Sequence, residues 1–482
     1  MSARVAVLRS RDAAPGLAVV FSLLLGLGVG YGIASELGDW ILLALTAPIF
    51  LAALLVVDRR LIVALWLFLT PFLAFYIKLE LPAGIPDLTA ARIFALLALG
   101  TTVLRVLARG MSPAVRRPDV WLLLFVALRS ISAFRSSGAL TEGLYILLDG
   151  LWLPLVMYLV VMRVFDCARD VSRIQRVIVW LAILGGGLGL VESALSLDRS
   201  IFDYLGASTG VFGVWKHEGV RRAAGPFLNP SSYGAFSGVA ALIALERWVV
   251  GGFGRRSAPM VLVLSLACVF FSLTRGAWLG TACGFLAFSW FSRSGRGVWF
   301  VPVAALLLAI GAGVASEDQS DAVGQRFGSE ATVYTRLALA DRAVKMMGQA
   351  PILGHGFGGF NQGHADVLSD FGSPDQLVSH NTYLTAAVDS GLPALLVLLA
   401  ALGRCLWRVG RQARAQSTSL ESRMRLASLG GGVVIYAASA LFVDMIYIGF
   451  DSTVWFLLIA MLNFAVDGSP RTPSKAPEAR CA

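Results

Sequence analysis

The chain has 482 residues, of which 57% are hydrophobic and only 15% are charged, whereas a soluble domain carries about 25% charged residues. Its 40 basic and 30 acidic residues give a net charge of +10, but the basic residues are scattered between apolar runs and form no basic stripe. This composition excludes a soluble globular protein, a disordered chain and a nucleic-acid-binding protein, and predicts an all-α polytopic membrane protein.

Apolar runs long enough to cross a bilayer, roughly 17–25 residues each, recur along the chain. Fourteen candidate spans are predicted, at about 17–33, 40–57, 61–77, 92–108, 120–134, 144–162, 177–195, 232–246, 259–273, 276–291, 297–315, 391–407, 426–444 and 452–467. The fifth is short and carries Arg129. The count falls to about twelve if that run and one other are re-entrant or interfacial, so about 12–14 transmembrane helices are expected.

The charges between the spans orient the chain. With the N-terminus inside, the inside segments hold 27 of the 40 basic residues, as expected for cytoplasmic loops. We therefore predict that both termini are cytoplasmic. The first span is interpreted as an uncleaved signal anchor, and the tail 468–482, rich in Pro, Ser and charge, is predicted to be disordered.

We divide the chain into an N-terminal transmembrane bundle, residues 1–195, and a membrane domain, residues 196–467. The second part contains two long outside loops, at about 196–231 and 316–390, and long loops are usually functional or disordered. The two loops hold all four histidines of the chain: His217, His355, His364 and His380. This indicates that the outer face is the working face, although the avoidance of hydrocarbon by histidine explains part of the pattern.

The first loop ends in two arginines, Arg221 and Arg222, followed by Gly-Pro and by Asn229-Pro230 at the start of a span. Arginine suits phosphate because its planar fork donates two parallel hydrogen bonds. The alternative is a pair of interfacial arginines that reach lipid headgroups, and spacing alone favours that alternative.

The second loop contains an amphipathic helix at about 331–348, which Gly348 and Pro351 end. Apolar residues recur at helical spacing on one face: Val333, Leu337, Ala340, Val344 and Met347. The other side carries basic residues: Arg336, Arg342 and Lys345. A basic amphipathic helix beside a membrane usually lies in the interface.

A glycine-dense stretch follows at 351–360. It includes Gly356 and lacks the Gly-Lys-Ser/Thr of a Walker motif. Its glycines would let the backbone approach a ligand or another helix closely.

The second loop closes with His380 and Asn381, where the pattern predicts the start of a helix. The partial positive charge of a helix N-terminus and nearby arginines both disfavour imidazolium. His380 is therefore expected to be neutral near pH 7 and able to accept a proton; the alternative is a capping or headgroup-contacting histidine. Asp389 lies about half a helical turn away in angle, so no direct His–Asp pair is expected.

Several motifs together resemble one family. They are Arg222-x-x-Gly225-x-Phe227-x-Asn229-Pro230, Thr274-Arg275-Gly276-Ala277, a helix with Arg336 before Pro351-x-x-Gly354-x-Gly356-x-Gly358, and His380-Asn381-x-x-Leu384 followed by Asp389-x-Gly391. In their order and outer-face placement they resemble the O-antigen ligase superfamily, which includes polysaccharide ligases, O-antigen-type polymerases and protein O-oligosaccharyltransferases. The resemblance spans about residues 200–465.

The resemblance implies a GT-C-like glycosyltransferase of the bacterial inner membrane that uses neither a metal nor another cofactor. The donor would be a glycan on undecaprenyl pyrophosphate at the periplasmic face, passed with inversion to a hydroxyl of a glycan or lipid-core acceptor. By motif position, the pyrophosphate would be held by Arg222 and Arg336. Arg275 would also hold it or, as the alternative, would only anchor a helix end. His380 would activate the acceptor, with Asn381, Asn229 and Gly356 in support.

Two alternatives stay open at this point. Within the family, the motifs do not separate a ligase of O-antigen type from a polymerase of O-antigen or exopolysaccharide assembly. Outside it, the rival is a transporter or flippase of lipid-linked glycans, although such proteins tend to show charged or broken helices at mid-membrane and inverted repeats.

Overall fold

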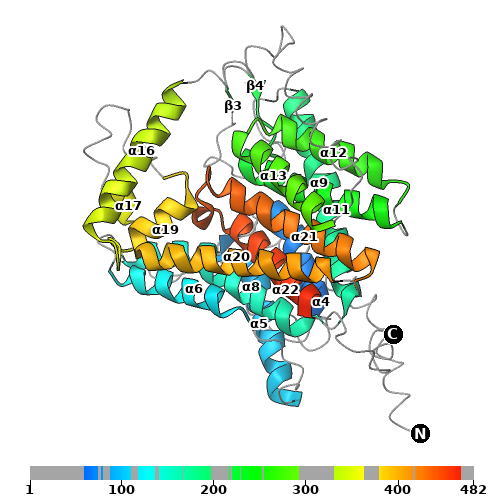
Figure 1. The fold of residues 1–482 in the computed structure, drawn as a ribbon, viewed down its shortest axis with the longest axis horizontal. Coiled ribbons are helices and arrows are strands. Elements are labelled where there is room, and N and C mark those ends of the chain that lie inside the picture. The colour runs from blue at the N-terminus through cyan, green and yellow to red at the C-terminus, as the bar shows by residue number, and fades with distance from the viewer. Residues whose placement is uncertain are drawn as a thin grey trace, which may run out of the picture.

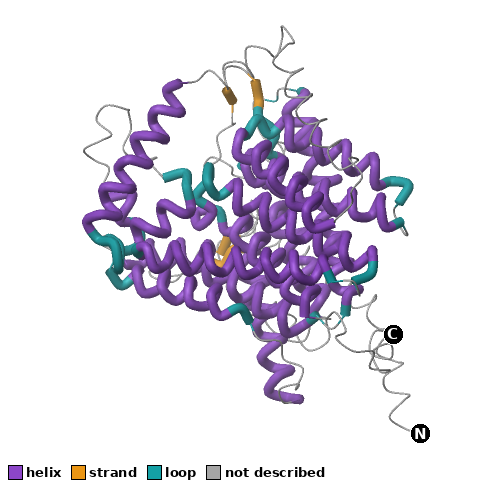
Figure 2. Tube along the Cα trace, in the orientation of Figure 1, coloured by secondary structure: helices purple, strands orange, loops and turns teal. Residues whose placement is uncertain are grey.

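Helices make up nearly all of the chain that the computed structural model describes (Figures 1 and 2). The described residues are 59–73, 78–79, 87–109, 118–135, 140–165, 167–195, 197, 216–217, 220–227, 229–251, 255–292, 330–362, 379–415 and 418–467. The predicted spans at about 17–33, 40–57 and 297–315 and the predicted disordered tail lie outside them.

The first half of the chain supplies a group of apolar helices: α4 (Arg59–Leu73), α5 (Ala90–Arg109), α6 (Val120–Ala133), α7 (Leu140–Leu147), the π-helical segment η1 (Leu148–Trp152), α8 (Leu153–Val164) and α9 (Ala168–Ala194). A short antiparallel hairpin, β1 (Lys78–Leu79) with β2 (Leu88–Thr89), precedes α5.

The second half begins with another hairpin, β3 (Lys216–His217) with β4 (Val220–Arg221). Its helices are η2 (Gly225–Phe227), α11 (Pro230–Val250), α12 (Ala258–Phe271), α13 (Arg275–Ser292), α16 (Glu330–Gln349), α17 (Gly359–Gln362), α19 (Thr382–Ser390), α20 (Leu392–Arg414), α21 (Leu420–Ser439), η5 (Met445–Tyr447) and α22 (Gly449–Asp467).

The all-α polytopic membrane fold predicted from the sequence is confirmed. Five described helical stretches are long and apolar enough to cross a membrane: Gly143–Val164, Ala168–Ala194, Pro230–Val250, Leu392–Arg414 and Gly449–Val466. A helix can cross lipid because it satisfies its backbone polar groups internally. Every predicted span that falls on described residues corresponds to a helix, and the one at 144–162 runs through the π-helical turn η1.

The helices pack through small residues as well as large apolar ones. At the crossing of α13 and α21, a Cβ built on Gly284 would stand 2.4 Å from Ile435 Cγ1, and one on Gly431 would stand 2.8 Å from the carbonyl oxygen of Gly284. Such close approach of helix backbones is typical of packing within membranes. The hydrophobic core contains residues from both sides of position 195, while the proposed domain division there stays a prediction.

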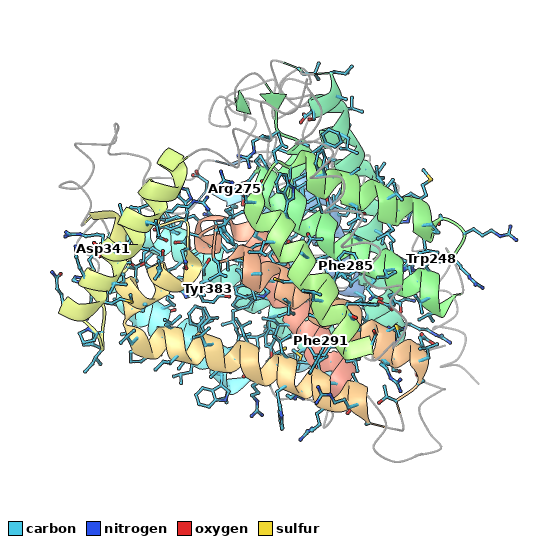
Figure 3. All side chains as sticks on the ribbon, turned by 45° about the horizontal axis from the view of Figure 1, so that its top comes forward. Trp248, Arg275, Phe285, Phe291, Asp341 and Tyr383 are labelled. Carbon is cyan, nitrogen blue, oxygen red and sulfur yellow. The ribbon has the colours of Figure 1, made fainter. Side chains whose placement is uncertain are left out.

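The connections at residues 222–227, 272–275, 354–360, 379–381 and 440–448 make up what we call the site end. Backbone hydrogen bonds join parts of it: the amide of Ala223 donates to the carbonyl oxygen of Phe271, and the amide of Thr382 donates to that of Ala440. Figure 3 shows Arg275, Asp341 and Tyr383 toward this end, and Trp248 and Phe291 toward the opposite end. The site end holds the starts of α11, α13, α19, α20 and α22. The described residues of the two predicted outside loops include 222–227, 354–360 and 379–381 of the site end.

The orientation of the chain can be tested by labelling. In a variant without the five native cysteines, a cysteine at Asn361 or Ser379 should react with an impermeant maleimide added to the periplasmic side. A cysteine at Arg411 or Ser474 should react only after permeabilisation, because the excess of basic residues in these segments predicts that they are cytoplasmic. Labelling of position 411 in intact cells would reverse the orientation and contradict a periplasmic site.

Candidate functional site at one end of the bundle

His380 stands directly before the first turn of α19. Asn381 is the N-cap of this helix, and its side-chain oxygen accepts hydrogen bonds from the backbone amides of Tyr383 and Leu384 at 3.0 and 3.1 Å. His380 itself has a φ of +50°, a region that non-glycine residues rarely adopt and that is often found at functional sites. The predicted helix start is thus confirmed, the capping group is Asn381, and His380 is an exposed residue.

Polar contacts fix the first turn of α19 to the connection between α21 and α22. The Thr382 hydroxyl donates to the carbonyl oxygen of Val443 at 2.9 Å and accepts from the amide of Met445 at 3.0 Å. The Tyr383 hydroxyl donates to the carbonyl oxygen of Ala437 at 2.7 Å. The backbone that carries His380 is therefore held at several points, as a group that must meet a reacting atom requires.

The surroundings of His380 keep it neutral. The many protein atoms around its ring lower its pKa below the ordinary value of about 6.5, and the positive charge of Arg336 lowers it further. The direction is the one expected from the sequence, and Arg336 is one of the nearby arginines expected to cause it, whereas the larger cause, desolvation, was not expected. Because the ring is neutral near pH 7 and accessible, one ring nitrogen can accept a proton.

Arg336 lies in α16, the predicted amphipathic helix. Its guanidinium stands 5.9 Å from the ring centre of Phe442 in the α21–α22 connection. The partial burial of Arg336 and the charge of Arg275 both lower its pKa. The charge of Arg275 therefore acts on Arg336, and the charge of Arg336 acts on His380.

The two faces of α16 have different partners. Leu339, Ala343 and Met346 are buried in a cluster with Phe360 and Val388. The face that the sequence pattern singled out is not the buried one, because Leu337 and Val344 are 60% and 59% exposed. An exposed apolar stripe on a membrane protein is compatible with the predicted interfacial position, while a second apolar face packs α16 against α19.

The glycine-dense stretch passes directly over the end of α19. Gly354 has a φ of +65°, and a Cβ built on it would stand 2.4 Å from the backbone of Asp389. The Gly356 amide donates to the carbonyl oxygen of Asp389 at 3.0 Å. The loop therefore approaches another helix, one of the two roles expected from its glycines. His355 contacts the carbonyl oxygen of Met346 through Nε2 at 2.8 Å and so joins the loop to α16.

Arg222 and Arg275 meet at the turn between α12 and α13. Arg222 donates through Nε to the carbonyl oxygen of Ser272 at 3.1 Å and through Nη2 to the hydroxyl of Thr274 at 2.6 Å. Leu273 in this turn has a φ of +46°. Arg222 thus braces the turn that presents Arg275 at the start of α13.

Asn229, His217 and His364 are not shown to join this group of basic residues. Asn229 caps α11, where its side chain accepts from the amide of Ser231 at 2.8 Å, so its observed role is structural. His217 lies in the hairpin β3–β4, and His364 lies outside the described residues. Within the described ranges no group of three His, Cys, Asp or Glu side chains is arranged to hold a metal ion.

One buried contact at this end was not expected. Arg129 of α6, in the span that looked weakest, pairs with Asp389 of α19: Nη1 and Oδ2 are 3.2 Å apart, and both side chains are almost fully buried. The signal was present, because a charged residue inside an apolar run usually has a partner and a function. The partner, 260 positions along the chain, could not be identified from spacing.

The site end can therefore bind and stabilise an anion beside a proton acceptor. Guanidinium groups fixed in a partly desolvated place stabilise negative charge that develops during a reaction. A neutral histidine next to them can take a proton from an attacking hydroxyl. This combination suits a group transfer in which an anionic leaving group departs.

Comparison with known proteins agrees with this chemistry. Residues 260–399 match the family model described as O-antigen ligase, a range that includes Arg275, Arg336 and His380 but not Arg222. Comparisons with curated proteins and with solved structures gave no match. The family match supports a membrane protein with a glycosyltransferase-like ligase activity and a role in glycan ligation or polysaccharide assembly. The match over residues 260–399 confirms the resemblance of this chain to the O-antigen ligase superfamily.

Proposed function

We propose that the protein transfers a glycan from undecaprenyl pyrophosphate to a hydroxyl group of an acceptor at the periplasmic face of the bacterial inner membrane. The acceptor is a lipid core or another glycan. The observation that carries the proposal is the meeting of Arg275, Arg336 and His380 at one end of the bundle, where each basic group lies within electrostatic range of the next.

The reaction follows from these groups. The acceptor oxygen attacks the anomeric carbon while its proton passes to a ring nitrogen of His380. The bond between the anomeric carbon and the pyrophosphate oxygen breaks, and its electron pair stays on the pyrophosphate. Arg275, Arg336 and Arg222 stabilise the growing negative charge, which is the role that a metal ion has in other transferases. Attack from the side opposite the leaving group inverts the anomeric centre.

A reconstitution experiment separates this proposal from a flippase. The purified protein in liposomes, supplied with a lipid-linked glycan and a labelled acceptor and with no ion gradient, should form a glycosylated acceptor and release undecaprenyl pyrophosphate. Product formation should continue with EDTA present, because arginines hold the leaving group. Inactive His380→Ala protein is the control for contaminating transferases.

Two outcomes would contradict the proposal. Movement of the donor across the bilayer without product, or movement only with a gradient, would indicate a flippase or transporter. Strict dependence on added Mg²⁺ or Mn²⁺ would contradict the metal-independent part alone. A panel of lipid-core and glycan acceptors in the same assay would separate ligase from polymerase.

A further inference from the structure

We propose that Arg129 and Asp389 are positioning residues, whose buried ion pair fixes the spacing between His380 and Arg336. This inference rests on the proposed transferase function. It concerns a residue of α6, which lies outside the matched domain at 260–399, and assigns to that helix a direct part in building the site.

Arg129 contacts α19 at three points through one nitrogen. Its Nη1 donates to Asp389 Oδ2 at 3.2 Å, to Ser390 Oγ at 3.1 Å and to the carbonyl oxygen of Thr385 at 3.4 Å. A second link joins the same helices, because Ser390 Oγ donates to Ser132 Oγ at 2.9 Å. The α19 partners, Thr385, Asp389 and Ser390, lie in the last two turns of the helix that begins just after His380.

Asp389 connects this pair to the glycine-dense loop. Its other oxygen, Oδ1, accepts from the amide of Phe360 at 3.2 Å, and its backbone carbonyl accepts from Gly356. The Arg129 guanidinium also stands 5.1 Å from the ring centre of Phe357. One carboxylate therefore joins α6, α19 and the loop.

The loop in turn determines where α16 lies. Phe360 and Val388 pack with Leu339 and Met346 of α16, and His355 contacts the backbone of α16. The helix that carries Arg336 and the helix that follows His380 are thus both packed around the position of Asp389. A change at the ion pair would move the two groups relative to each other.

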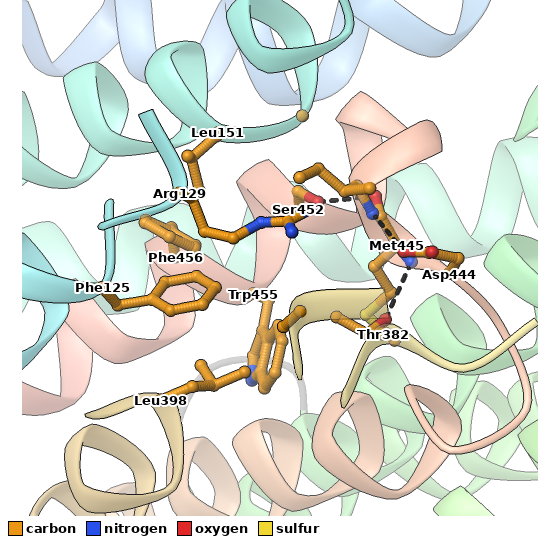
Figure 4. Close-up of a pocket in the computed structure, with 13 residues that line it drawn as sticks. Phe125, Arg129, Leu151, Thr382, Leu398, Asp444, Met445, Ser452, Trp455 and Phe456 are labelled. Carbon is orange, nitrogen blue, oxygen red and sulfur yellow. Dashed lines mark hydrogen bonds between the residues drawn. The ribbon is translucent and has the colours of Figure 1, made fainter. Parts of the chain in front are cut away.

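Apolar side chains do not completely fill the space between α19 and α6. A cavity of about 30 Å³ lies there, bordered by Thr382 and Ala386 of α19, by Asp444, and by Arg129 itself (Figure 4). Arg129 Nε has no hydrogen-bond partner within the described chain. Replacement of a buried ion pair by apolar groups is often neutral or stabilising, so stability is a poor explanation for this one. Orientation of α19 beside the cavity explains it better.

The test compares Arg129→Met with wild type in the liposome assay. We expect turnover per folded protein to fall by roughly 10–100-fold, as misplacement of about 1 Å can cause, with the KM for the lipid-linked donor little changed. Arg129→Lys should recover part of the loss. Its ammonium group can donate to the same acceptors, but the lysine side chain is shorter than that of arginine and lacks the planar fork.

A second measurement does not depend on activity. Diethyl pyrocarbonate modifies neutral histidine, so the pH dependence of modification at His380, followed by peptide mass spectrometry, reports its pKa. If Arg129→Met lets α16 and α19 separate, Arg336 acts less on His380 and the midpoint should move up toward the ordinary value. A lower unfolding temperature alone would not move it.

The matched control is Arg425→Met at the opposite end. Arg425 is also buried and lies 2.6 Å from Glu421 and 3.9 Å from Glu246. The Arg425→Met protein should lose stability but keep the turnover and the His380 midpoint of wild type.

Unchanged turnover and midpoint in Arg129→Met would overturn the proposal, as would equal effects in Arg425→Met. If Arg129→Met does not fold, Arg129→Lys and Ser390→Ala answer the same question. An inactive wild type would instead refute the transferase function.

Discussion

His380→Ala should lose roughly 10²–10⁴-fold in turnover, the usual contribution of a general base. The structure gives the reason: His380 is exposed, the charge of Arg336 helps to lower its pKa, and Asn381 provides the helix cap. Donor binding should be nearly unchanged, since arginines hold the pyrophosphate. Turnover per folded protein and donor affinity, measured in parallel, check this expectation.

The other histidines are the controls. His355→Ala removes a contact to the backbone of α16 and should reduce activity less than His380→Ala. His364 has no matching motif position and should also give a milder effect. A well-folded His380→Ala protein that keeps more than a tenth of wild-type turnover would favour a structural role. Equal losses at all three positions would indicate general damage to the loop.

The pH dependence of activity follows from the same surroundings. Partial desolvation by the surrounding protein atoms and the charge of Arg336 lower the pKa of His380, so the neutral form persists down to a pH below the ordinary value of about 6.5. Activity should therefore fall on acidification only below that value. The unfolded chain binds this proton more readily, so the same group makes the fold less stable as pH falls below about 6.5.

Local patterns in the sequence predicted much of this fold and site. Apolar runs predicted the helices correctly, because an apolar segment in lipid must pair its backbone polar groups internally and a helix does so. The helix start at His380 and Asn381 and the close approach of the glycine-dense stretch were predicted correctly, because both depend on local residue types. The cap itself is Asn381, not His380. The basic motifs led to Arg275, Arg336 and His380, which the fold brings together at one end.

Contacts between distant parts of the chain could not be predicted in this way. The pattern on α16 identified one apolar face, but only the fold shows that Leu339, Ala343 and Met346 are the residues that pack. Arg129 made its span look weak, because its charge counts against a membrane helix until Asp389 is seen beside it. Arg222 also differs from the expectation of a pure ligand group, since part of its fork holds the turn at Ser272.

The arginine assignments predict the second large effect. Arg336→Ala should leave no measurable transfer, a loss of at least about 10²–10³-fold, because a fixed donor to the leaving group acts mainly in the transition state. Arg336→Lys should restore little, since lysine holds phosphate as a point charge and not as a planar fork. Lys345→Ala on the same helix is the control, because Lys345 is exposed and pairs with Asp341; it should retain activity.

Arg222→Ala should be as inactive as Arg336→Ala, for a partly different reason. Its side chain makes two hydrogen bonds to the turn before α13, so its loss should both weaken pyrophosphate binding and loosen the turn that presents Arg275. A thermal unfolding measurement separates the two arginines: Arg222→Ala should lower the unfolding temperature more than Arg336→Ala does. Wild-type turnover by either alanine variant would reduce that arginine to a headgroup contact. Full recovery by lysine would show that charge alone, without the paired geometry of guanidinium, is enough to hold the leaving group.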